Sequence, residues 1–260
     1  MTTSSLPSPP AEFRTRLNTL LSQISAPVLH NSAWIGAFEQ LMGAVFSLME
    51  SDKRGFSHRD HSLAVYHPVV QCRIASLLRE LDAGTEITQK DALDQWFSRY
   101  YFNSGIQRVT FAAERLMATF AALPCRCGSR SPEITIRNNK PPKFKERLNG
   151  AQIRLTHVET EYAALPSLKA VLGQLGTPYD RNEPFDPTRG LAMIRHDVNN
   201  RKHSVYKRSE TLDSLPRPSS GTVTWSDAGS QARMETGVAC VELVGSAYGE
   251  LLTWHPRASF

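Results

Sequence analysis

Apolar residues recur at every third or fourth position along most of this chain, which is the spacing of an amphipathic α-helix rather than of a β-strand. The pattern predicts helices over residues 11–24, 33–50, 89–122 and 227–254. Further helices are expected after His67-Pro68, over 145–175 and over 188–206. Short strand-like runs occur at 133–137 and 221–225. The expected fold is therefore all-α, a bundle of six to seven helices with long basic loops and at most a minor hairpin.

Glycine and proline refine these boundaries. Gly105 is expected to bend the helix over 89–122, because glycine weakens a helix interior by about 1 kcal/mol relative to alanine. Pro166 is expected to interrupt the helix over 145–175, and Gly173 and Gly176 are expected to end it.

Two irregular segments separate the later helices. Residues 124–147 are rich in proline and basic residues, and residues 209–230 are rich in Ser, Pro and Gly. Residues 1–12 form a Ser/Pro-rich tail, expected to be disordered, without the pattern of a signal peptide, and no window has the ~18–20 apolar residues of a membrane span. The four cysteines do not form a disulfide framework in a chain of this size. We therefore expect a cytoplasmic protein without membrane contact, with residues 13–260 as one helical domain.

Basic residues gather in two stretches of a chain whose formal net charge is +5. Seven lysines and arginines between Arg126 and Arg147 face only Glu133 and Glu146. Five more, from Arg195 to Arg208, face Asp197 alone. Such clusters suit a phosphate backbone or another anionic partner. A solvated loop or helix face has the same composition, so charge alone does not decide between them.

The second basic stretch, IRHDVNNRKHSVYKR over 194–208, has the helical spacing of a two-sided element. One side carries His196, Asn199, Asn200 and His203, with Arg201 and Lys202 beside them. The opposite side carries the apolar Leu191, Ile194, Val198 and Val205. This predicts a helix with a buried seam and a polar ridge flanked by cations. Two consecutive asparagines are also typical of a helix end, which would separate the ridge residues.

This combination of side chains suits RNA cleavage without a metal. A base removes the 2′-hydroxyl proton and an acid protonates the leaving oxygen, and histidine performs both near neutral pH. Arginine stabilises the negative charge that develops on phosphorus with two parallel hydrogen bonds. Spacing alone leaves three interpretations open: catalysis, nucleic-acid binding without cutting, and a solvated helix face.

A metal site is the weaker alternative. His196 and His203 lie about 10.5 Å apart along an ideal helix, too far for one ion. His58 and His61, with Asp60 between them, have a spacing that could hold a metal, but no further ligand motif completes the set. We expect no cofactor and no metal.

Three parts of the chain resemble the HEPN superfamily, small all-α bundles that include RNases of toxin–antitoxin and phage-defence systems. YYFNSGIQRVTFAAERLM is similar to their second core helix, IRHDVNNRKHS to their arginine, polar residue and histidine signature, and the apolar helix at the end to their closing helix. The family places four to six residues between arginine and histidine, whereas residues 196–202 separate Arg195 from His203. That separation turns the two side chains about 80° apart on an ideal helix.

The resemblance implies specific roles. Arg195 would hold the scissile phosphate, His203 would act as acid or base, and His196 would be the polar companion. Asn199, Asn200, Arg201 and Lys202 would contact the substrate. Family members dimerise so that two such helices line one cleft, which the basic loop would flank, and a protein partner such as an antitoxin would accompany the RNA. The leading hypothesis is thus a metal-independent endoribonuclease, and the alternative is a catalytically silent helical module that binds nucleic acid or a protein partner.

Overall fold

The computed structural model describes residues 12–26, 34–56, 87–123, 143–161, 164–179, 187–196, 198 and 230–254. All regular structure in these ranges is helical, which confirms the all-α fold, and no strand occurs in them. The helices are α1 (Glu12–Gln23), α2 (Ile35–Lys53), α4 (Ile87–Ala122), α5 (Phe144–Glu161), α6 (Pro166–Gly176), the 3-10 turn η4 (Pro187–Arg189) and α8 (Ser230–Trp254). None of the helices described is long and apolar enough to cross a membrane.

The helices predicted from apolar spacing agree with α1, α2, α4 and α8 to within a few residues. The interruption at Pro166 is confirmed, because α5 ends at Glu161 and Pro166 is the first residue of α6. There its fixed φ suits a helix start and its missing N–H costs nothing. Gly173 does not end α6, which continues to Gly176. The predicted basic loop is four residues too long, because α5 already begins at Phe144.

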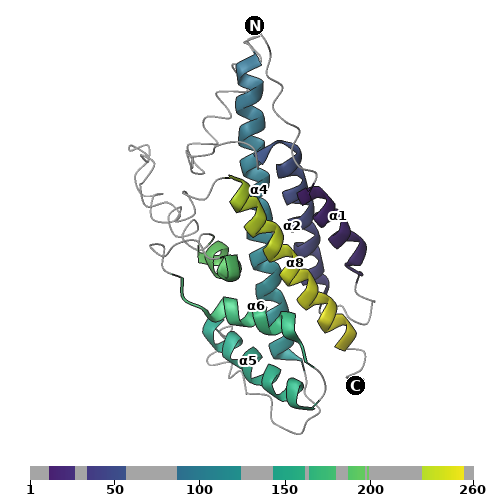
Figure 1. Ribbon diagram of the computed structural model, residues 1–260. Helices are drawn as coiled ribbons and strands as arrows, with labels where there is room; N and C mark the ends of the chain where they lie inside the picture. The colour runs from purple at the N-terminus through teal and green to yellow at the C-terminus, as the bar shows by residue number, and fades with distance from the viewer. Residues whose placement is uncertain are drawn as a thin grey trace.

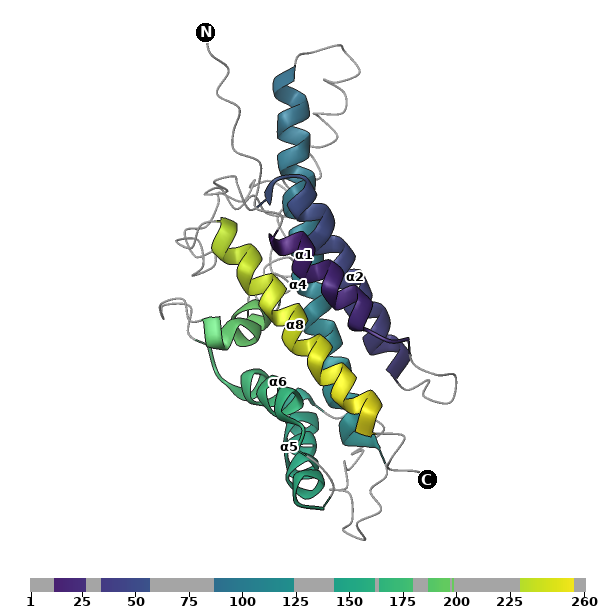
Figure 2. The same ribbon diagram turned by 45° about the vertical axis from the view of Figure 1, so that its right-hand side comes forward.

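The long helix α4 is the axis of the bundle (Figure 1). Helices α2 and α8 pack along it, and α1 lies against both α2 and α8 (Figure 2). Helices α5 and α6 pack together at the end of the bundle where α4 and α8 finish. The core between these helices is made of fully buried side chains, among them Leu17, Trp34, Leu41, Leu48, Ile106, Leu116, Phe120, Leu168, Leu172 and Tyr248.

Helices α2 and α4 approach each other closely at Gly105. A Cβ atom at this position would lie 2.8 Å from Cδ2 of Leu48, which is fully buried. Helix α4 is continuous through Gly105, where the glycine makes room for the leucine of its neighbour.

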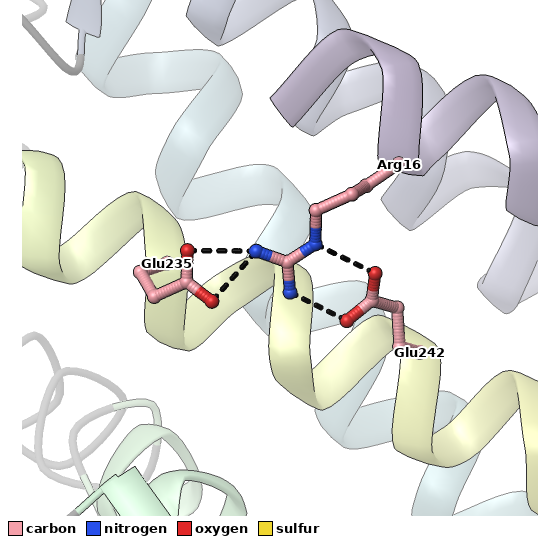
Figure 3. A network of polar contacts seen from close by, with 3 residues as sticks. All are labelled: Arg16, Glu235 and Glu242. Atoms are coloured by element: carbon pink, nitrogen blue, oxygen red, sulfur yellow. Dashed lines mark hydrogen bonds and ion pairs between the residues drawn. The ribbon is translucent and has the colours of Figure 1, made fainter. Parts of the chain in front are cut away.

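An ion-pair network fastens α1 to α8 (Figure 3). Arg16 donates from Nη1 to both carboxylate oxygens of Glu235 at 2.7 Å. Its Nε and Nη2 donate to the two oxygens of Glu242 at 2.8 and 2.6 Å. Hydrogen bonding to Glu242, joined by Glu235 and opposed by desolvation, raises the pKa of Arg16 above its ordinary value. All three nitrogens of the Arg16 guanidinium thus donate hydrogen bonds within the fold.

Helix α6 receives its N-terminal cap from another helix. Its N-cap residue, Leu165, has no side-chain hydrogen bond to offer. Instead, the carboxylate of Glu250 on α8 accepts from the backbone N–H groups of Ser167 at 2.9 Å and Leu168 at 3.0 Å. A carboxylate at this place satisfies two unpaired donors and meets the positive end of the helix dipole.

We expect Glu250→Ala to lower the free energy of unfolding by about 1–2 kcal/mol, because both N–H groups lose their acceptor. Glu39→Ala is the matched control, since Glu39 is an exposed glutamate of α2 and its loss should change stability by less than about 0.5 kcal/mol. Urea unfolding of the three proteins measures the difference. Equal stabilities of the two variants would show that the cap contributes nothing.

Candidate functional site

The segment predicted to carry the site begins at η4, and residues 190–196 and 198 are helical. Its apolar seam is confirmed, because Leu191, Ile194 and Val198 are buried. Arg195 and His196 are half-buried at its edge. The remaining predicted site residues, with the neighbours on which the ridge depends, lie outside the described residues: Asp197, Asn199, Asn200, Arg201, Lys202, His203 and Val205. The continuity of this helix to residue 206 stays a prediction.

The start of the segment is held between α6 and α8. Oε1 of Gln174 on α6 accepts from the backbone N–H of Leu191 at 2.8 Å. Gly190 lies so close to α8 that a Cβ there would be 3.1 Å from Sγ of Cys240 and from a methyl group of Thr236. Burial raises the pKa of the Cys240 thiol to about 12, so the group is a packing element at neutral pH. These contacts position the start of the segment, and with it the backbone from which the Arg195 side chain extends.

Arg195 is held by two different helices. Its Nε donates to Oε1 of Glu114 on α4 at 3.2 Å. Its Cζ lies 3.6 Å from the centre of the Phe144 ring at the start of α5, which is cation–π distance. The side chain keeps 23% of its surface exposed. Among the described residues, none forms a hydrogen bond or ion pair with its two terminal amino groups, which make up the end-on fork that pairs with a phosphate or carboxylate.

This contact joins Phe144, which lies within the first basic stretch, to Arg195, the first cation of the second. Phe144 is flanked by the exposed Lys143 and Lys145, the last part of the first stretch, while Arg195 opens the second. The carboxylate of Glu146 accepts from the backbone N–H of Lys143 at 2.8 Å and so fixes the start of α5. Arg195 therefore contacts a ring whose two neighbours in the chain are exposed lysines. We call Arg195, Glu114, Phe144, Lys143 and Lys145 the Arg195 site.

His196 turns to a different neighbour. Its ring meets the ring of Tyr179 edge to face, with centroids 5.5 Å apart. Cζ of Arg189 lies 5.8 Å from the centre of the same tyrosine ring, and Nη2 of Arg189 donates to the carbonyl of Pro178. Successive helical residues differ by about 100°, which is why Arg195 and His196 reach separate partners. A shared role of the two side chains stays a prediction.

Sequence reasoning missed three members of this region: Glu114, Phe144 and Tyr179. Glu114 had no signal, because 81 positions separate it from Arg195. Phe144 had one, since an aromatic residue between lysines in a basic segment is typical of nucleic-acid contacts. No group of three potential metal ligands occurs among the residues described, and His58 and His61 lie outside them.

Comparison of the chain with protein families, with curated proteins and with solved structures gives no match. Function is therefore inferred from the side chains and their geometry.

Proposed function

We propose that this protein binds the sugar–phosphate backbone of RNA at the Arg195 site. The observation that carries the proposal is the way Arg195 is held: Glu114 takes only Nε, Phe144 supports the flat face, and the terminal fork stays unused among the described residues. A guanidinium fixed in this way is already oriented for two parallel hydrogen bonds to phosphate oxygens. The exposed Lys143 and Lys145, on either side of Phe144 in the chain, add positive charge to this end of α5.

The competing explanation is that Arg195 and Glu114 form only a structural ion pair between α4 and the segment. Two features favour ligand binding. The terminal amino groups of Arg16 are taken up by Glu235 and Glu242, whereas no described residue takes up those of Arg195. The described cations of the two basic stretches, Lys143 and Lys145 of the first and Arg195 of the second, also lie at or beside one contact, which favours a polymer with repeated negative charges over a single small anion. The resemblance to HEPN proteins supports RNA as that polymer.

Binding of a labelled single-stranded RNA, followed by fluorescence anisotropy in chelator, tests this proposal. We expect Arg195→Gln and Lys145→Gln each to weaken binding roughly 5-fold at about 0.1 M salt, and to lower the slope of log affinity against log salt by about 0.7. Lys145→Gln is included because it leaves the contact between Arg195 and Glu114 intact.

Lys169→Gln is the control, because Lys169 is an exposed lysine paired with Glu159 on the α5–α6 pair and its loss changes the net charge equally. If all three variants weaken binding to the same degree, only net charge matters and the Arg195 site is not the binding surface. Thermal unfolding of each variant verifies that the fold is kept.

Cleavage of the bound RNA is the second candidate function. The observation that favours it is again the immobilised guanidinium, because an arginine held in one geometry can stabilise charge that develops on the phosphate in a transition state. His203 is proposed as the acid or base, with His196 as its companion and Asn199, Asn200, Arg201 and Lys202 as substrate contacts. A homodimer with two such segments at one cleft, and a protein partner such as an antitoxin, belong to the same proposal. It requires cleavage in chelator that depends on both Arg195 and His203.

A further inference from the structure

Two arginines of α4 lie across two glycines of α2. A Cβ at Gly43 would be 2.6 Å from Nη1 of Arg108, and a Cβ at Gly36 would overlap Nη1 of Arg115. Both glycines and both arginines are about two helical turns apart, roughly 10 Å along each axis. The two antiparallel helices therefore show the same arrangement twice. In each case a guanidinium of α4 lies against the backbone of α2 at a glycine, where any other residue would place a Cβ atom in its way.

Among the residues that the structure describes, these two cations have no acidic partner, in contrast to four other arginines of the bundle. Arg14, Arg16, Arg54 and Arg195 each form an ion pair with a carboxylate. Within the described residues, no carboxylate pairs with Arg108 or Arg115. A guanidinium without a counter-charge on a protein surface is a ready partner for an anion.

Large apolar side chains are exposed on the same two helices. Phe46 of α2 is 54% exposed and Tyr100 of α4 is 51% exposed. Helical spacing places Tyr100 within about 80° of Arg108 and Arg115 on α4, and it places Phe46 one turn from Gly43 on α2. We call Arg108, Arg115, Phe46 and Tyr100 the α2–α4 face. Cations together with exposed aromatic rings are the combination by which proteins hold single-stranded nucleic acid, since arginines contact phosphates while bases stack on the rings.

The α2–α4 face lies on the same helix as the Arg195 site. Arg115 directly follows Glu114, the residue that holds Arg195. Adjacent helical residues point about 100° apart, so the two surfaces flank one part of α4, and Phe111, half-buried, lies on the arc between them. A helix with its side chains is about 10–12 Å across, a distance that a short stretch of extended RNA can span.

We propose that the α2–α4 face is a second contact for the same RNA strand. Single-stranded RNA that leaves the Arg195 site crosses α4, its phosphates meet Arg115 and Arg108, and its bases stack on Tyr100 and Phe46. This inference rests on the proposed function, and it names the substrate as single-stranded RNA long enough to cover both surfaces.

RNA length separates the two surfaces experimentally. Anisotropy is measured with single-stranded RNAs of about 4 and about 16 nucleotides, the range of site sizes known for single-strand binding. For the longer RNA, we expect Arg108→Gln and Arg115→Gln each to weaken binding roughly 5-fold at about 0.1 M salt and to lower the salt slope by about 0.7. Phe46→Ala is expected to weaken it at least about 5-fold through lost stacking. The shorter RNA should bind these variants as it binds the wild type.

Arg195→Gln and Lys169→Gln serve as reference variants. Arg195→Gln should weaken the binding of both RNAs, whereas Lys169→Gln should weaken the binding of neither. If Arg195→Gln weakens the longer RNA while the variants of the α2–α4 face behave like Lys169→Gln, the second contact is wrong and the proposed function stands. If the wild type binds neither RNA, or Arg195→Gln has no effect, both proposals fall. Sedimentation velocity tests whether a second copy of the chain binds the α2–α4 face instead of RNA. Variants of this face that dissociate a dimer without changing RNA affinity would show that it joins two copies of the chain, and the proposal would be overturned.

Discussion

Cleavage of RNA in chelator is expected to fall at least about 100-fold when either Arg195 or His203 is replaced by alanine. Loss of a general acid or base typically costs 10²–10⁴-fold, and loss of a group that stabilises transition-state charge costs a similar factor. Arg195→Lys is expected to lose cleavage activity as well, although it keeps the positive charge. The three donors of lysine lie on a single nitrogen, so lysine cannot hold Glu114 from one atom while presenting a two-pronged end to the phosphate from two others. The rate is measured by gel from single turnovers with excess protein.

Two controls make this result interpretable. Lys169→Ala removes an exposed cation from α6 and should leave the rate unchanged. Cleavage that persists unchanged in Arg195→Ala and in His203→Ala would come from a contaminating nuclease and would end the catalytic proposal. Absence of cleavage together with salt-sensitive RNA binding would leave the binding function alone. Activity abolished by chelator would point instead to a metal-dependent reaction.

The second large effect is expected in the core, where α2 and α4 touch. Leu48→Ala should lower the free energy of unfolding by about 2–5 kcal/mol, because it leaves a cavity at a fully buried position. Gly105→Ala should lower it by about 1–3 kcal/mol, since the new methyl group meets the Leu48 side chain. In the Leu48→Ala background, the same glycine substitution should stabilise the protein by up to about 1 kcal/mol, because the colliding atoms are gone and alanine favours the helix.

Urea unfolding of the two single variants and the double variant measures this coupling directly. Gly173→Ala is the matched control, because a Cβ at this helical position meets nothing within 4 Å. It should stabilise the protein by about 1 kcal/mol through helix propensity alone. A Gly105→Ala variant as stable as Gly173→Ala would show that α2 and α4 are not in close contact at Leu48.

The glycines show which effects sequence neighbours alone do not reveal. Gly105 was expected to bend its helix and Gly173 to end its helix, and both lie inside continuous helices. Gly105 is needed because Leu48 of another helix approaches it, whereas Gly173 faces open space. The effect of a helical glycine depends on its spatial neighbour, which no window of sequence contains. Pro166 was predictable because its effect is intrinsic: the ring acts on the backbone of its own residue and the one before it.

The sequence by itself determined the helices and their buried sides. Apolar residues at helical spacing predict α1, α2, α4 and α8, and they predict the buried seam of Leu191, Ile194 and Val198. These features are local, because burial of one side of a helix follows from the order of residues along it. The concentration of basic residues in two stretches was equally visible in the sequence.

Only the tertiary structure decided which polar groups meet. Arg195 and Glu114 are 81 positions apart, the N–H groups of α6 and Glu250 are 82 and 83 apart, and Arg16 and Glu242 are 226 apart. Charge has no periodicity that selects a partner, and any of the 25 acidic residues could pair with a given arginine. Packing of the apolar seams places the helices first, and that placement determines which cations are neutralised and which, like Arg108 and Arg115, are left on the surface without a carboxylate among the residues described.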